Sequence, residues 1–105
     1  LDPACFICHY NLGNLYWSTE AHPQALESFR SAVELRADDV DARFNLAITH
    51  LVMEDLAAAQ PLLETLSVDD PDNGIVWREL GRIYALQARI PESEAAYERA
   101  EALGQ

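Results

Sequence analysis

The feature that most constrains the fold is a set of residues that recurs every 34 positions without a gap. In each copy a leucine precedes a very small residue, and a ring-bearing side chain stands three places after the small residue. The three copies are Leu12-Gly13 with Tyr16, Leu46-Ala47 with His50, and Leu80-Gly81 with Tyr84. A period of this length marks one supersecondary unit that buries its apolar face by stacking on its neighbours. The sequence therefore predicts an array of three similar units.

Each unit is predicted to contain two helices. The chain has sixteen alanines and only four glycines, a balance that favours helix over strand. Apolar residues at helical spacing predict a first helix from Phe6 to about Ser18. Pro23 suits the first turn of a second helix, which ends near Arg36. Later helices are bounded by capping residues and prolines at Asp38, Asp39, Asp41, Pro71, Asp72, Asn73 and Pro91. Pro61 falls inside a predicted helix, where it should remove a hydrogen bond or shift the helix start.

The recurring residues resemble the tetratricopeptide repeat, whose pattern is W-x2-L-G-x2-Y followed by A-x3-F and a proline. The third unit matches the first half of the pattern with Trp77, Leu80, Gly81 and Tyr84, and the first unit has His9 at the tryptophan position. The resemblance implies an all-α fold of three antiparallel helix hairpins in a right-handed superhelical solenoid. Repeats are expected over about 6–39, 40–73 and 74–105, with the small residues at the helix crossings.

Two features depart from a complete array of this family. The glycine common in the turn within each hairpin is replaced by Glu20, Glu54 and Ala88, so we expect these turns to deviate from the family's shape. Residues 1–5 look like the tail of a preceding repeat, because Pro3 has the same phase as Pro71. Since no extra polar helix follows the third repeat, the sequence predicts an excerpt of a larger protein.

In this family the first helix of each hairpin lines a concave groove, so the resemblance implies a binding surface for a peptide or partner segment. The predicted lining residues are Tyr10, Asn11, Asn14, Trp17, Phe44, Asn45, Ile48, Arg78 and Arg82. An asparagine amide both donates and accepts, so the three asparagines would pair with the backbone of an extended peptide. The aromatic and aliphatic residues would take apolar side chains. Arg78 and Arg82 would hold a carboxylate, unless they pair with local acids such as Glu79.

Composition narrows the class of function. Acidic residues outnumber basic ones 18 to 7, giving a net charge of −11. Nucleic acid and anionic membrane surfaces require a basic patch, and no apolar run is long enough to insert into a membrane, so neither is an expected partner. No phosphate loop, nucleophile elbow or metalloprotease signature predicts an enzyme, a cofactor or a metal site. The sequence predicts a non-catalytic protein–protein interaction module of bacterial type, or alternatively a repeat domain appended to an enzyme.

Cys5, Cys8 and His9 form the pattern C-x-x-C-H, which is typical of c-type haem attachment. No second axial ligand is clearly placed. A redox dithiol is a second alternative, because the N-terminus of a helix favours the thiolate. A metal site that includes His22 is a third, but it lacks a fourth ligand. The preferred interpretation is that both cysteines are small apolar residues that pack at the start of a helix.

The two ends of the array predict a further property. We expect the last helix, from about Glu92, to leave bare some of Ala96, Tyr97, Ala100 and Leu103, and residues near Phe6 to be partly bare as well. Head-to-tail contacts between copies would cover both surfaces. The net charge of −11 opposes such contacts, so weak self-association promoted by salt is predicted.

Overall fold

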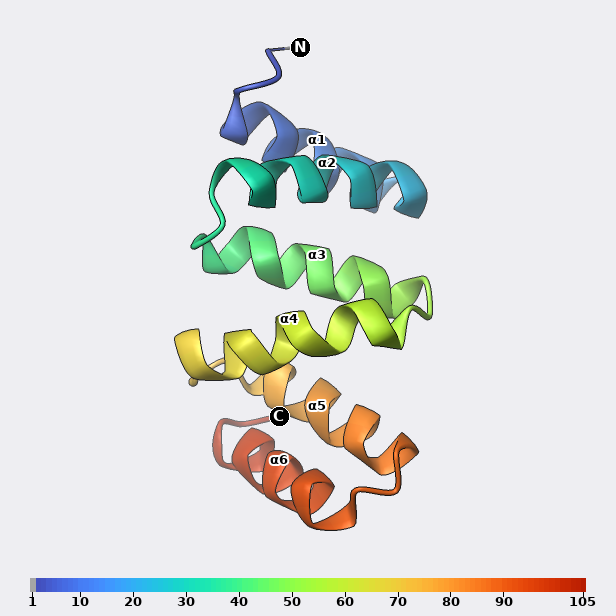
Figure 1. The fold of residues 1–105 in the computed structure, drawn as a ribbon, viewed down its shortest axis with the longest axis vertical. Helices are drawn as coiled ribbons and strands as arrows, with labels where there is room; N and C mark the ends of the chain where they lie inside the picture. Colours follow the sequence, from blue (N-terminus) through green and yellow to red (C-terminus); the bar gives the residue numbers. More distant parts are fainter. Residues whose placement is uncertain (1) are drawn as a thin grey trace. The chain divides into compact units, whose positions relative to one another are not determined.

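The computed structural model describes residues 2–105 and leaves Leu1, part of the predicted preceding tail, outside the described residues. Within this range the chain forms six α-helices and no strand, as the sequence predicted (Figure 1). The helices are α1 (Phe6–Ser18), α2 (His22–Leu35), α3 (Val40–Val52), α4 (Leu56–Asp69), α5 (Gly74–Leu86) and α6 (Ile90–Ala102).

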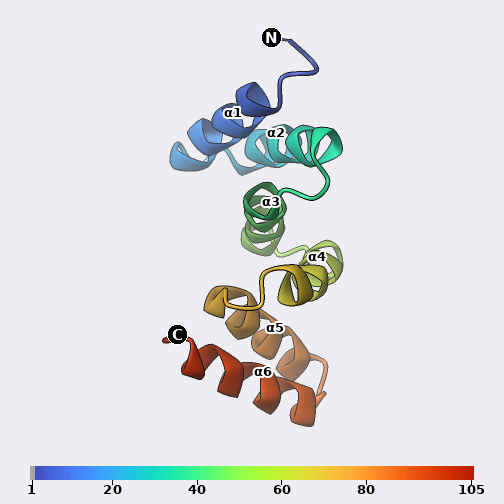
Figure 2. The ribbon, with the colours of Figure 1, turned by 90° about the vertical axis from the view of Figure 1, so that its left-hand side faces the viewer.

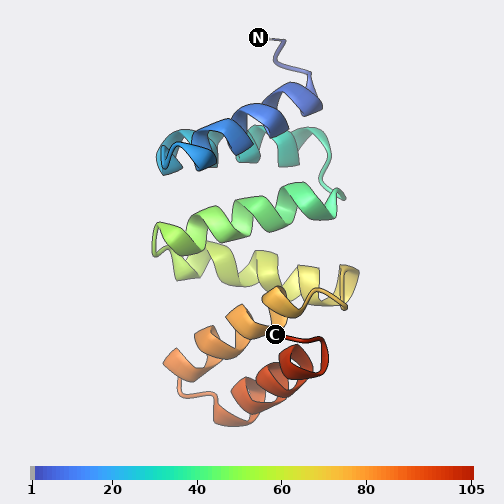
Figure 3. The ribbon, with the colours of Figure 1, turned by 180° about the vertical axis from the view of Figure 1, so that it is seen from behind.

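The chain divides into two compact units, one ending at Ala59 and the other running from Gln60 to Gln105. The first unit contains α1, α2 and α3, and Figure 3 shows α1 in front of α2. The second contains α5 and α6, which lie beside each other in Figure 2. The division falls inside α4, next to Pro61. This helix begins at Leu56 and continues through the proline, so Pro61 removes one backbone donor without setting the helix start.

The turns that precede α1, α3 and α5 are equivalent in backbone bonding. The N–H groups of Cys5, Asp39 and Asn73 donate to carbonyls three residues earlier, at 3.1, 3.2 and 3.1 Å. These same residues are the N-caps of the three helices, and each side chain accepts a first-turn N–H. The turn before α1 therefore has the structure of the two turns between hairpins.

A ring on the first helix of a hairpin also contacts this turn. Trp77 donates its indole Nε1–H to the Pro71 carbonyl at 2.7 Å, and His9 Nε2 lies 3.3 Å from the Pro3 carbonyl. Both pairs are separated by six residues and stand two periods apart in the sequence. The histidine at the tryptophan position thus keeps the contact that the larger ring makes in the third repeat.

The turns within the hairpins keep a left-handed residue although none contains glycine. Glu20, Glu54 and Ala88 have φ of 60°, 61° and 59°. In each turn, the N–H of the left-handed residue and the N–H of the residue after it donate to carbonyls in the last turn of the preceding helix. The bonds run from Glu20 to Trp17 and Ala21 to Tyr16, from Glu54 to Leu51 and Asp55 to His50, and from Ala88 to Ala85 and Arg89 to Tyr84. This bonding is the Schellman motif, which usually has glycine at its left-handed position. The prediction that these turns deviate is therefore wrong, because the hydrogen bonds hold the backbone in the same conformation in all three.

Small residues lie where the helices of a hairpin approach most closely. A Cβ atom at Gly13 would stand 2.5 Å from Cε1 of Phe29, whose ring is 1% exposed. A Cβ atom at Gly81 would stand 3.0 Å from the ring of Tyr97. The Gly81 carbonyl also accepts the Ser93 hydroxyl at 2.8 Å across the same crossing. Ala47, the residue in the same phase, is fully buried.

Exposure differs from expectation at both ends of the array. Phe6 is 8% exposed and lies under the Arg36 guanidinium, 4.3 Å from its ring centroid, whereas the neighbouring Ile7 is 53% exposed. Ala96 and Ala100 on α6 are 3% and 2% exposed, because they face α5. Of the residues expected to be bare, Tyr97 is the exposed one, at 42%. The expected bare surface is therefore confirmed in part, at Tyr97 and at Ile7 beside Phe6, and is wrong for Phe6, Ala96 and Ala100.

Tyr84 and Glu64 interact between a second helix and the first helix of the next hairpin. Tyr84 Oη donates to Glu64 at 2.7 Å, and burial followed by this hydrogen bond raises the pKa of Tyr84 to about 12. One period earlier, Arg30 and His50 hold the same positions. Burial lowers the pKa of His50 against the attraction of Asp55, and the charge of Arg30 adds to the lowering.

The shifted pKa values of Tyr84 and His50 make the stability of the protein depend on pH in opposite directions. The folded protein holds the Tyr84 proton more tightly than the unfolded chain, so this contribution is complete below about pH 10 and is lost as the pH rises toward 12. The His50 contribution is complete above about pH 6.5 and is lost as the pH falls through the lowered pKa.

An alkaline titration of tyrosinate absorbance should show one tyrosine that ionises near pH 12. The Tyr84→Phe variant should lack that step. Tyr97→Phe is the matched control, and it should keep the step because the hydroxyl that bonds Glu64 is that of Tyr84, whereas the Tyr97 ring is 42% exposed. A folded wild-type chain in which all tyrosines ionise together would contradict the role assigned to Glu64.

Candidate peptide-binding surface

The first compact unit brings together two of the predicted asparagines. Asn45 on α3 donates its Nδ2–H to Oδ1 of Asn14 on α1 at 3.5 Å, a long contact. Asn14 is exposed and Asn45 half-buried. Asn11 is exposed and makes no side-chain hydrogen bond to residues 2–105. This contact uses the amide nitrogen of Asn45 and the amide oxygen of Asn14. The amide nitrogen of Asn14 can therefore still donate, and the amide oxygen of Asn45 can still accept.

Aromatic rings on α1 are fixed by packing within the same unit. Tyr10 stacks on Phe6 with ring centroids 5.8 Å apart, and its edge meets Phe29 at 6.3 Å. The Trp17 ring lies 4.9 Å from that of His22 at an angle of 61°. Tyr10 and Trp17 are both half-buried, so each keeps part of its surface open to solvent. Rings held in this way lose little conformational entropy when they contact a ligand.

Apolar side chains continue along α1 and α3. Phe44 and Ile48 on α3 are half-buried. Ile7 on α1 and Val52 on α3 are exposed at 53% and 47%. Leu15 on α1 is also exposed, at 58%. The first unit therefore presents more apolar surface than the predicted lining residues alone provide.

Charge is scarce on these two helices. Helix α1 carries no acidic or basic residue apart from His9. On α3 the Arg43 guanidinium donates to the Asp38 carbonyl and the residue is 8% exposed, while His50 is equally buried. Asp41, in the first turn, is the exposed charged residue of α3. A ligand on this surface would therefore meet a neutral environment with one carboxylate near its edge.

Arg78 and Arg82 lie on α5 in the second unit and both reach Glu79. Arg82 bonds Glu79 Oε2 through Nε at 3.1 Å and Nη2 at 3.0 Å, and Arg78 Nη2 bonds Oε1 at 3.3 Å. Arg78 also donates to Gln105 at 3.4 Å. This is the local pairing that the sequence left open. A carboxylate-binding role for the two arginines stays a prediction and would require competition with Glu79.

A cavity of about 280 Å³ between α1 and α2 was missed by the sequence analysis. Its lining residues are His9, Leu12, Tyr16, Gln24, Glu27, Ser28 and Ser31. Two of the lining residues, Leu12 and Tyr16, correspond to residues of the third repeat that are buried or hydrogen-bonded. Leu80 is 1% exposed, and Tyr84 donates a hydrogen bond to Glu64 of α4. The 34-residue repeat is the sequence signal that could have revealed this cavity. It places Leu12 and Tyr16 at the positions that Leu80 and Tyr84 occupy in the third repeat.

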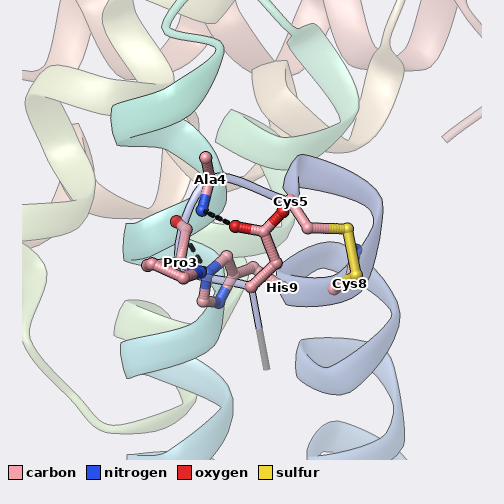
Figure 4. The surroundings of a disulfide bond; sticks show 6 residues. Pro3, Ala4, Cys5, Cys8 and His9 are labelled. Atoms are coloured by element: carbon pink, nitrogen blue, oxygen red, sulfur yellow. Dashed lines mark hydrogen bonds between the residues drawn. A yellow bond between two sulfur atoms is a disulfide. The ribbon is translucent and has the colours of Figure 1, made fainter.

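Cys5 and Cys8 form a disulfide at the start of α1 (Figure 4). The preferred interpretation, that both are simply small apolar residues packed at the start of a helix, is therefore wrong, because their sulfurs are bonded to each other. The Cα atoms of an N-cap and the third helical residue are close, here 5.2 Å apart, which lies within the range that a disulfide spans. Within residues 2–105, no three side chains of the metal-binding types gather into a candidate metal site. No helix described here has the length and apolarity to cross a membrane.

Comparison with known proteins agrees with this architecture. No curated protein matches the sequence significantly. A crystal structure of MamA superposes with a TM-score of 0.86 at 18% identity, covering 98% of this chain and 60% of MamA. A MamA structure designated MSR-1 C2 gives 0.83 at 18% identity, with 97% and 59% covered. The TPR domain of Arabidopsis OM64 gives 0.82 at 17% identity, with 94% and 82% covered.

The chain thus spans about 60% of the length of the MamA structures that it matches. At these identities the likeness establishes the fold, a tetratricopeptide-like array of helix hairpins. The family model of the tetratricopeptide repeat matches residues 16–80, which is more than half of the sequence. The chain belongs to the tetratricopeptide repeat family.

Proposed function

We propose that the first unit binds an extended peptide segment of a partner protein across α1 and α3, without catalysis. Tetratricopeptide repeats generally serve as protein–protein interaction modules, and members of the family are typically non-catalytic scaffolds. The contact between Asn14 and Asn45 is the observation that carries the proposal, since it links the two helices through amides that keep donors and acceptors free.

The proposed peptide lies with its backbone against Asn11, Asn14 and Asn45. Amide side chains match the donor and acceptor of a peptide group, so they bind backbone without selecting sequence. Selectivity would come from side chains that pack on Tyr10, Trp17, Phe44 and Ile48. Large aromatic residues of this kind contribute most to binding when they are fixed and partly desolvated.

Charge sets the second criterion for the partner. The surface of α1 and α3 has Asp41 as its exposed charged residue, and the whole chain carries a charge of −11. A peptide that is apolar at its centre and neutral or basic at one end fits this distribution. An acidic group would bind in the second unit at Arg78 and Arg82, and only where it displaces Glu79 from them.

The proposal is tested by selecting peptides from a random displayed library on the immobilised chain. The selected sequences should be rich in aromatic and aliphatic residues and poor in acids. Replacing Asn45 by alanine should weaken their binding about tenfold, because one or two backbone hydrogen bonds of about 1 kcal/mol each are lost.

Gln24→Ala is the matched control, because it removes an exposed amide from α2 and should leave affinity unchanged. Circular dichroism should show that both variants keep the helical content of the parent chain. Equal affinity of the Asn45→Ala variant and the parent would exclude the α1–α3 surface. Failure to enrich any sequence would argue against peptide binding itself.

A further inference from the structure

Cys5 occupies the position at which the other two repeats place a polar capping group. Asp39 Oδ1 accepts from the N–H of Ala42 at 2.9 Å, and Asn73 Oδ1 accepts from the N–H of Ile75 at 3.1 Å. Cys5 Sγ accepts from the N–H of Cys8 at 3.1 Å. The three residues stand one period apart, so the cysteine sulfur lies where a repeat of this chain normally holds an oxygen acceptor.

The aspartate at this position shows that it accommodates an anion. First-turn N–H groups have no partner within their own helix, and the helix dipole stabilises negative charge there. A reduced Cys5 would place its thiolate where the second repeat holds the carboxylate of Asp39. Cys8 lies within the first turn of α1 and donates this backbone N–H, so its own sulfur gains no equivalent contact. The two sulfurs are therefore chemically unequal, and Cys5 is the better leaving group.

We propose that Cys5–Cys8 is a thiol–disulfide exchange site whose reaction partner is a dithiol. In the first step a thiolate of the partner attacks Cys8 Sγ, a mixed disulfide forms, and the Cys5–Cys8 bond breaks with release of the Cys5 thiolate. In the second step the remaining partner thiol, as its thiolate, attacks the partner sulfur of the mixed disulfide and releases Cys8. Two electrons and two protons pass to the chain, which becomes a dithiol, and the partner becomes a disulfide.

The surroundings leave the pair within reach of a partner. Cys5 and Cys8 are half-buried, and Ile7 between them is 53% exposed. Three charged or titratable groups contact the same segment. Asp2 accepts the N–H of Ala4 at 2.9 Å, the His9 ring lies against the Pro3 carbonyl, and the Arg36 guanidinium covers the ring of Phe6. The negative charge of Asp2 disfavours a thiolate at Cys5, and the positive charge of Arg36 favours it. Because these two effects oppose each other, the N-terminus of α1 determines how well the thiolate is stabilised.

The decisive experiment compares two single-cysteine variants. In Cys8→Ser the remaining thiol is Cys5, and in Cys5→Ser it is Cys8. Iodoacetamide alkylation is measured against pH for each. We expect the rate for Cys5 to reach half its maximum about half to one pH unit lower than the rate for Cys8, as a helix N-terminus produces. Serine is a favourable N-cap, so Cys5→Ser should keep the start of α1, and Cys8→Ser keeps Cys5 as the N-cap. Circular dichroism verifies that both variants fold.

A second measurement uses the wild-type chain and a small dithiol, dithiothreitol. The untreated chain should show no thiol to Ellman's reagent, and treatment with dithiothreitol should release two thiols that disappear again when the oxidised reagent is supplied. Equal half-maximal pH values for the two variants would overturn the inference. So would two free thiols before reduction, or a covalently bound haem in the absorption spectrum of the purified protein.

Discussion

Replacing Gly13 by alanine should destabilise the protein by about 1–3 kcal/mol, even though alanine is the better helix former. The new Cβ would stand 2.5 and 2.6 Å from two carbons of the Phe29 ring, distances at which one of the two groups must move. Phe29 is 1% exposed and is also held by the edge of Tyr10, so it has no free space to move into. The overpacking therefore outweighs the roughly 1 kcal/mol that alanine contributes to helix propensity.

Gly81→Ala is the matched control for this prediction. Its Cβ would meet the ring of Tyr97 at 3.0–3.1 Å, and that ring is 42% exposed and free to rotate outward. The clash and the gain in helix propensity should nearly cancel, leaving stability within about 1 kcal/mol of the parent. Urea unfolding followed by circular dichroism measures both variants. Equal loss at the two sites would show that ring mobility does not decide the cost.

Substituting glycine for Glu20, Glu54 and Ala88 together should stabilise the protein by about 2 kcal/mol. A left-handed residue with a Cβ costs about 1–2 kcal/mol, and the greater flexibility of unfolded glycine offsets part of the relief. The carboxylates of Glu20 and Glu54 make no hydrogen bond or ion pair with the described residues, so their removal breaks no contact. Each single variant should contribute about a third of the effect, since each turn has its own backbone hydrogen bonds and shares none with the other two.

The control is Ala95→Gly, at an exposed position within α6, which should lose about 1 kcal/mol because its backbone is helical. Thermal and urea unfolding of the parent and the five variants would compare the effects on one scale. A triple variant that is less stable than the parent would mean that these turns relax to another conformation in solution.

Helix boundaries follow from local signals, and for that reason the sequence predicted them well. The cap at Asp39, the cap at Asn73 and the prolines at positions 23 and 91 act on the residues next to them. The repeat adds information that no single window contains. It identified Gly13 and Gly81 as crossing residues before any contact was known.

The turn residues could not be predicted, because tertiary packing overrides a local preference. Glu20, Glu54 and Ala88 are poor choices for a left-handed conformation. Two backbone hydrogen bonds in each turn, together with the helices on either side, fix that conformation nevertheless. A rule based on residue type detects a missing glycine and cannot detect the bonds that replace its effect.

The candidate site was predictable in register and not in detail. The period placed Asn14 and Asn45 on neighbouring first helices, and the structure brings them into contact. The stacking of Tyr10 on Phe6 and the pairing of Arg82 with Glu79 depend on side-chain rotamers. The disulfide depends on the distance between two Cα atoms, which the spacing C-x-x-C permits in a helix and does not require.

Helix α6 is acidic at the positions by which α2 and α4 contact the next helix. Val33 packs with Ala42 of α3, and Gln60 and Glu64 bond Gln87 and Tyr84 of α5. The counterparts on α6 are Glu101, Glu94 and Glu98, and all three are exposed; Glu98 matches Glu64, whereas Glu101 and Glu94 stand in place of uncharged residues. A stack that adds identical copies at such a face elongates without limit, as heterologous contacts do. Three carboxylates here oppose each addition in a chain of charge −11, so growth of a fibre through α6 is self-limiting unless salt or a cationic helix neutralises them.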